Sequence, residues 1–214
     1  MIQRDHIMRM IQQLTAALAK ALFNRELKQF DDALEVIDTT GERLFGMKWK
    51  LLRNFSDEQI IELLGYEETL GKLFAAAELL REESDILLEQ GKDEESHGQG
   101  LKSFSIYVEL ISRELSYRKI SSVDKFAALL DRLEQYEFSR RMELKRCKYY
   151  IIVGKFDMAG EILRGLNALD SSLGNEGAAF VRNLLKKSNE ELSDANLVRQ
   201  RLEEEAKTIE RGAL

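Results

Sequence analysis

The chain contains few side chains that could act as nucleophiles or metal ligands. Its two histidines, His6 and His97, fall in separate predicted helices with no cysteine nearby, so a metal site would need carboxylates to complete it. We interpret both as surface imidazoles, because polar side chains are mostly exposed. The single cysteine, Cys147, lies in a basic stretch that would favour a reactive thiolate. Its place in a predicted helix seam instead favours an inert packing role.

No motif of a catalytic or phosphate-binding site is complete in the sequence. Residues 91–103, GKDEESHGQGLKS, contain glycine, lysine and serine, but not in the order of a P-loop, and no strand precedes them. We interpret this segment as a turn between two helices. The patterns HExxH, GxSxG and GxGxxG are absent. The sequence therefore predicts no enzyme, no cofactor and no metal site, although an enzyme built from carboxylates alone would escape these patterns.

A basic segment remains as a candidate binding surface. Residues 140–148, RRMELKRCK, hold five basic residues and one acid, and Arg141, Lys145 and Lys148 share one helix face. This face could bind an acidic peptide or a phosphate. The alternative is a solvated outer face that pairs with nearby acids such as Glu134.

The overall charge argues against a nucleic-acid partner. The formal net charge is −6, whereas nucleic-acid binders usually carry a basic excess. The acidic residues 81–95, REESDILLEQGKDEE, could repel DNA or pair with a basic partner. One cysteine cannot form an internal disulfide, and no apolar run reaches the length of a membrane span. We therefore expect a cytoplasmic protein with neither nucleic-acid nor membrane partners.

The elements that must position these residues are predicted to be helices. The 214 residues include no proline and no stretch of strand-like alternation, which favours long helices with short connections. A capping box at Ser56 and Gln59 predicts the start of a short helix. We expect about ten helices in one all-α domain over residues 1–214, arranged as an array of antiparallel hairpins. Residues 170–177, DSSLGNEG, are the best candidate for a linker, with 178–214 as capping helices.

One pattern of small and aromatic residues marks a predicted hairpin at Gly154. Cys147 stands seven residues before this turn, Phe156 two residues after it and Ala159 five residues after it. Glycine supplies the left-handed backbone of the turn, and the small residues let the two helices approach closely. The pattern therefore predicts two antiparallel helices with a tight seam.

The same pattern fits two earlier positions. Around Lys28 the corresponding residues are Ala21, Phe30 and Ala33. Around Gly91 they are Ser84, Asp93 and Ser96, a poorer match because Asp93 stands where an aromatic is expected. The three turns are 63 residues apart, which is nearly two units of a helical-hairpin repeat of about 34 residues.

These hairpins resemble the tetratricopeptide repeat, which has small, aromatic, glycine and alanine residues in this order. The resemblance is clearest in residues 144–169 and fair in 16–37, and the usual terminal proline of the repeat is missing throughout. The opening MIQRDHIMRMIQQL is also similar to the start of an uncharacterised family of Gram-positive bacterial proteins with tetratricopeptide-like folds. The resemblance implies a fold and a bacterial source, and it implies no activity.

Stacked hairpins form a concave surface that can hold a peptide or a partner protein. We therefore expect a non-catalytic interaction module, a scaffold or adaptor whose partner the sequence does not identify. The candidate residues of a polar groove are Asn24, Arg25, Arg141, Lys145 and Tyr149.

A structural protein that assembles with copies of itself is the alternative. Phe45, Trp49 and Phe55, in the segment LFGMKWKLLRNF, could supply an apolar contact for a homodimer. An enzyme that uses only carboxylates is a more remote alternative.

Overall fold

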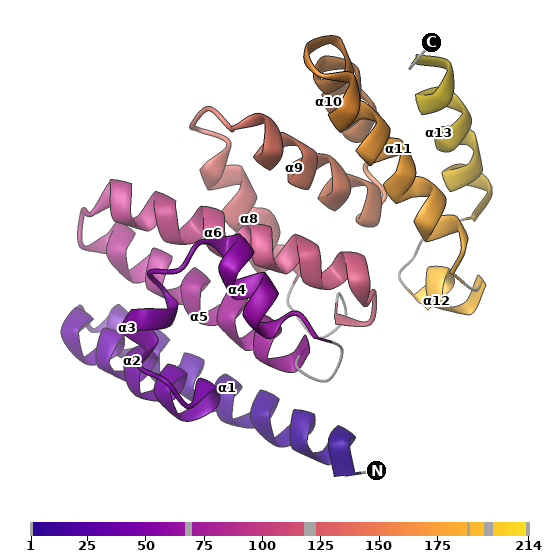
Figure 1. The fold of residues 1–214 in the computed structure, drawn as a ribbon. Coiled ribbons are helices and arrows are strands. Elements are labelled where there is room, and N and C mark those ends of the chain that lie inside the picture. Colours follow the sequence, from indigo (N-terminus) through magenta and orange to yellow (C-terminus); the bar gives the residue numbers. More distant parts are fainter. Residues whose placement is uncertain (1, 67–69, 118–122, 188, 195–198, 213–214) are drawn as a thin grey trace. The chain divides into compact units, whose positions relative to one another are not determined.

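The computed structural model describes residues 2–66, 70–117, 123–187, 189–194 and 199–212 (Figure 1). Within these ranges the regular elements are helices and no strand occurs, which confirms the predicted all-α class. In chain order the helices are α1 (Ile2–Glu26), α2 (Phe30–Phe45), α3 (Trp49–Leu52), α4 (Asp57–Leu64), α5 (Leu70–Glu89), α6 (Asp93–Arg113), α8 (Val123–Leu133), α9 (Arg140–Ile152), α10 (Phe156–Leu169), α11 (Ser171–Leu185), α12 (Asn189–Asp194) and α13 (Arg199–Gly212).

The chain divides into two compact units. The first comprises residues 1–110 together with 129–133, and the second comprises 111–128 together with 134–214. In the first, α1 packs against α2 and α5, α2 also contacts α3 and α5, and α4 contacts α5. In the second, α9, α10 and α11 pack against one another, and α13 covers α10 and α11.

The segment expected as a linker is helical. Asp170 caps α11, because its carboxylate accepts the backbone N–H of Ser172 at 2.9 Å. The two glycines of this segment allow close packing. A Cβ on Gly174 would lie 2.9 Å from the Asn167 Cβ, and a Cβ on Gly177 would collide with Leu163. Glycine here lets α11 approach α10, so the composition that suggested a flexible linker has a packing cause.

Three hairpins share one turn geometry, and the three positions are those that the sequence pattern predicts. Lys28, Gly91 and Gly154 have φ values of 59°, 74° and 79°, in the left-handed region. In each turn the next N–H donates to a carbonyl five residues back: Gln29 to Asn24 at 2.9 Å, Lys92 to Leu87 at 2.9 Å, and Lys155 to Tyr150 at 2.8 Å. A second bond runs from each turn residue to the carbonyl three residues back. Together they form the Schellman pattern that closes a helix end.

The small residues flanking each turn form the seams of the hairpins, as predicted. The pairs Ala21 and Ala33, Ser84 and Ser96, and Cys147 and Ala159 are all buried. In the middle hairpin each serine hydroxyl donates to the other residue's carbonyl, at 2.7 and 2.8 Å. The Cys147 Sγ lies 3.7 Å from the Ala159 carbonyl oxygen. Small residues at these positions therefore bring the helix backbones close together.

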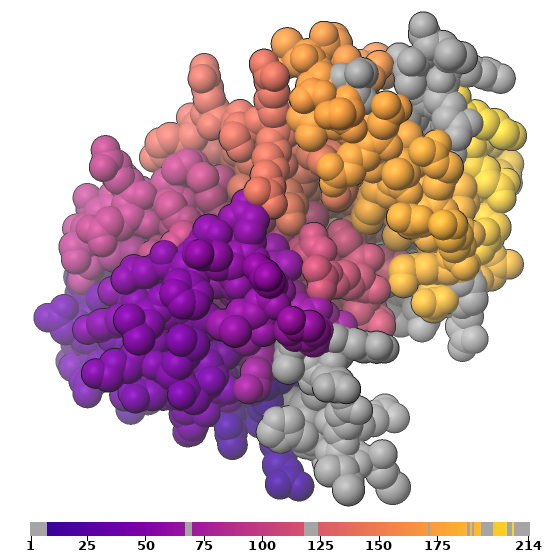
Figure 2. Space-filling model, viewed as in Figure 1, coloured from indigo at the N-terminus to yellow at the C-terminus, as the bar shows by residue number. Residues whose placement is uncertain are grey.

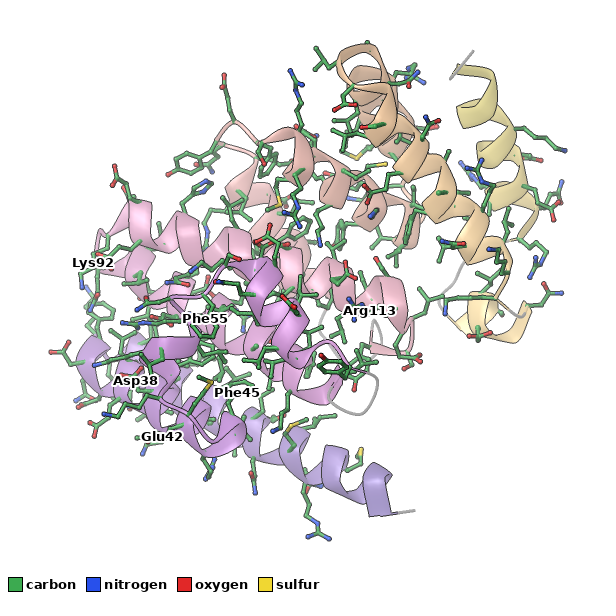
Figure 3. All side chains as sticks on the ribbon, viewed as in Figure 1. Asp38, Glu42, Phe45, Phe55, Lys92 and Arg113 are labelled. Atoms are coloured by element: carbon green, nitrogen blue, oxygen red, sulfur yellow. The ribbon has the colours of Figure 1, made fainter. Side chains whose placement is uncertain are left out.

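The first unit is built around α5, which is buried along most of its length. Figure 2 shows the atoms of the N-terminal helices, in indigo and purple, closely packed on the face in view. Phe45, at the end of α2, and Phe55, between α3 and α4, belong to this packing and are partly exposed (Figure 3).

Trp49 is part of this core and is not the exposed apolar contact that the sequence suggested. It is 1% exposed and stacks on Phe45 with 5.7 Å between ring centroids. A Cβ on Gly41 would lie 2.8 Å from the Trp49 Cβ, so the indole packs directly on the bare backbone of α2. Trp49 can be buried because Gly41 has no side chain at the point where the indole packs.

Candidate functional site

The five residues predicted to line a polar groove fall in both units. Asn24 and Arg25 belong to the first unit, where Asn24 is buried at the end of α1. Arg141, Lys145 and Tyr149 belong to α9 of the second unit. Arg141 is exposed, whereas Lys145 and Tyr149 are buried, and the Tyr149 ring lies 5.8 Å from that of Tyr150.

Arg25 is joined to the acidic helix α5 by three ion pairs. Its guanidinium nitrogens lie 2.8 Å from Glu82, 3.3 Å from Asp85 and 3.1 Å from Glu89. Its side chain is 15% exposed, and its charge is paired with acids of the same unit. Arg25 thus secures α1 to α5.

The acidic segment 81–95 begins in the interior of the first unit. Glu82 and Glu83 are 3% and 1% exposed, and Arg81 is 5% exposed. A buried charge is costly unless it is paired. These residues therefore find their partners within the chain.

Arg81 is the centre of one ion cluster on α5. It pairs with Glu78 at 3.3 Å, with Glu82 at 3.3 Å and with Asp85 at 2.8 Å. Burial by itself would lower the pKa of Arg81, but the three acids together raise it. Arg132 of α8 extends the cluster, since it pairs with Asp85 at 2.7 Å.

Glu83 is the centre of a second cluster. It accepts the Trp49 Nε1–H at 2.9 Å and pairs with Arg53. Burial raises the pKa of the Glu83 carboxyl above its usual range, although Arg53 and Trp49 act in the opposite direction. Lys102 of α6 donates to the Arg53 carbonyl at 2.6 Å, and burial lowers its pKa. The cluster fixes the α3 segment against α5 and α6.

In both clusters the charged side chains are paired with one another. Each of their carboxylates is matched by an arginine, so little charge remains for a ligand. Within the described ranges, no three or more histidine, cysteine, aspartate or glutamate side chains are placed to hold a metal ion. A buried ion network of this kind can fix one register of its helices.

The second unit carries a surface groove between α9 and α10, with a volume of about 440 Å³. We call it the α9–α10 groove. Its apolar lining consists of Phe138, Met158, Ile162, Leu166 and Leu169. Its charged lining consists of Arg140, Glu143, Arg146 and Glu161. Gly165 completes it.

The floor of the groove exposes apolar side chains of α10. Met158 is 39% exposed and Leu169 is 65% exposed. The adjacent face of α10 is buried against its neighbours through Ala159 and Leu163, and Leu166 is 3% exposed where this face meets the groove. The helix thus has a wide apolar surface, of which the part at Ala159 and Leu163 is covered and the part at Met158 and Leu169 is not.

Arg146 holds the α9 wall of the groove in place. It pairs with Glu143 at 3.1 Å and with Glu134 at 3.4 Å, the acid expected to neutralise this segment. Its guanidinium also lies over the rings of Phe138 and Tyr150, at 5.3 and 5.9 Å. Two basic residues of the segment are therefore paired within the unit, since Lys148 also bonds to Glu176 at 2.7 Å.

Glu143 presents an acceptor beside the groove. Its Oε2 atom is buried and has no hydrogen-bond partner among the described residues. Burial raises the pKa of this carboxyl, while Arg146 lowers it and Glu134 raises it further. A donor on a bound molecule would satisfy this oxygen.

Gly165 has no packing role within the described chain. A Cβ built there would meet nothing within 4 Å. Glycine inside a helix costs about 0.5–1 kcal/mol relative to alanine. The groove therefore carries a destabilising residue that no internal contact requires.

Cys147 and His97, two of the reactive side chains singled out in the sequence, do not line this groove. Burial raises the pKa of the Cys147 thiol to about 12, which leaves it protonated and supports the packing interpretation. His97 is partly buried, and burial followed by the charge of Arg132 lowers its pKa. The side chain of His6 lies outside the described residues.

Sequence reasoning missed the groove residues on α10. The signal was present, because Met158, Ile162, Gly165 and Leu169 follow one helical face while Ala159, Leu163 and Leu166 follow another.

The chain matches one protein family along nearly its whole length. Neither a curated protein nor a solved structure matches the chain. No helix among the described residues has the length and hydropathy needed to cross a membrane. Residues 1–212 match a family described as a family of unknown function (DUF6483), and the chain belongs to that family.

Proposed function

We propose that this protein is a non-catalytic protein-interaction module and that the α9–α10 groove is its binding surface. The observation that carries the proposal is the uncovered apolar face of α10, with Met158 39% and Leu169 65% exposed inside a groove. Contiguous exposed apolar surface with a polar rim is typical of protein-binding sites.

The dimensions of the groove favour a helical segment as its ligand. Met158 and Leu169 are eleven residues apart on one helix, so the apolar row is about 16 Å long at 1.5 Å per residue. Three turns of an amphipathic helix have this length and offer side chains at matching intervals.

The three equivalent hairpins support the resemblance to tetratricopeptide repeats, which use helix surfaces to bind peptides. The single buried Cys147 fits a reducing, cytoplasmic location. Catalysis is the weaker proposal, because the carboxylates of α5 are paired with arginines.

A displayed library of amphipathic helical peptides tests this function. We expect selected peptides to lose about tenfold or more in affinity when Met158 and Leu169 are both changed to lysine, since each buried apolar anchor contributes about 1 kcal/mol or more. The matched control changes Leu51 and Leu63 to lysine, because these leucines are 55% and 46% exposed on the first unit. A library that yields no ligand, or ligands equally sensitive to both variants, would contradict the proposal.

A further inference from the structure

We draw no further inference here: the strongest candidate, the exposed apolar face of α1 formed by Met8, Ala16, Ala19, Phe23 and Leu27, carries none because nothing in the structure shows what covers it.

Discussion

The α5–α6 and α9–α10 hairpins have the same turn and different interiors. Both turns place a glycine in the left-handed region, with φ values of 74° and 79°, and both are closed by the same pair of backbone hydrogen bonds. The first hairpin joins two serines in its seam, while the second joins a cysteine and an alanine. The same hairpin turn is therefore compatible with a serine pair or with a cysteine–alanine pair where the two helices are closest.

The side chains around α5 and α10 differ in polarity and in burial. Buried ion pairs surround α5, with Glu83 at 1% exposure bonded to Trp49 and Arg53. On α10 the second apolar face is left uncovered, with Leu169 at 65% exposure. The surroundings of α5 are thus fixed by polar contacts within the chain, whereas part of the apolar surface of α10 is left uncovered.

The largest expected effect on the free energy of unfolding comes from Glu83, in the buried ion pairs of α5. Glu83→Ala leaves the Arg53 charge and the Trp49 N–H without their acceptor in the core, which should cost about 3–5 kcal/mol of unfolding free energy. Urea denaturation measures the loss. The control is Glu89→Ala, since Glu89 is 46% exposed and its pair with Arg25 should contribute less than about 1 kcal/mol. Equal effects from both changes would show that the buried network does not hold the first unit.

Exchanging the seam residues sharpens the comparison. Ser84→Cys should cost about 1–3 kcal/mol, because Arg132 Nη2 donates to the Ser84 hydroxyl at 2.7 Å and would lose this buried acceptor. Cys147→Ser should cost less, because the new hydroxyl can donate to the Ala159 carbonyl as Ser84 does to Ser96. Denaturant titration of both variants gives the ranking, and a larger loss for Cys147→Ser would contradict it.

The shared turn predicts matched effects at three positions. Gly91→Ala and Gly154→Ala should each cost about 1–2 kcal/mol, since an L-residue is strained in the left-handed region. Lys28→Gly should stabilise the chain, because Lys28 already occupies that region with φ 59°. Thermal unfolding of the three variants tests whether the turns are equivalent. Opposite signs at Gly91 and Gly154 would break the equivalence.

The pH-dependent effect, which vanishes at neutral pH, concerns the thiol of Cys147. The pKa of this thiol is raised from 9.0 to about 12 by burial. A raised pKa means that the folded state holds the proton more tightly, so its contribution is complete below about pH 9 and is lost as the pH rises toward 12. The difference in unfolding free energy between the parent and Cys147→Ala should therefore shrink across this window. A difference that stays constant with pH would indicate an ordinary thiol.

Local features of the fold were predictable from the sequence, and the environment of the helices was not. The turns at Lys28, Gly91 and Gly154 and the capping box at Ser56 depend on residues close together in the chain. The burial of α5 depends on arginines that come from other helices, such as Arg25 and Arg132.

The candidate site was less predictable for the same reason. Periodicity identifies two apolar faces on α10, but packing against α9, α11 and α13 determines which face is covered. Gly174 and Gly177 were also misleading in the sequence. Glycine in this segment suggested a linker, whereas in the structure both residues allow α11 to pack closely on α10.

Titration of the selected amphipathic helical peptides tests the central claim about the α9–α10 groove most directly. The peptides are titrated against the parent chain, the Met158→Lys, Leu169→Lys variant and the Leu51→Lys, Leu63→Lys control. We expect the groove variant to lose about tenfold or more in affinity and the control to bind as the parent chain does. Equal losses in both variants, or no loss in the groove variant, would contradict the account.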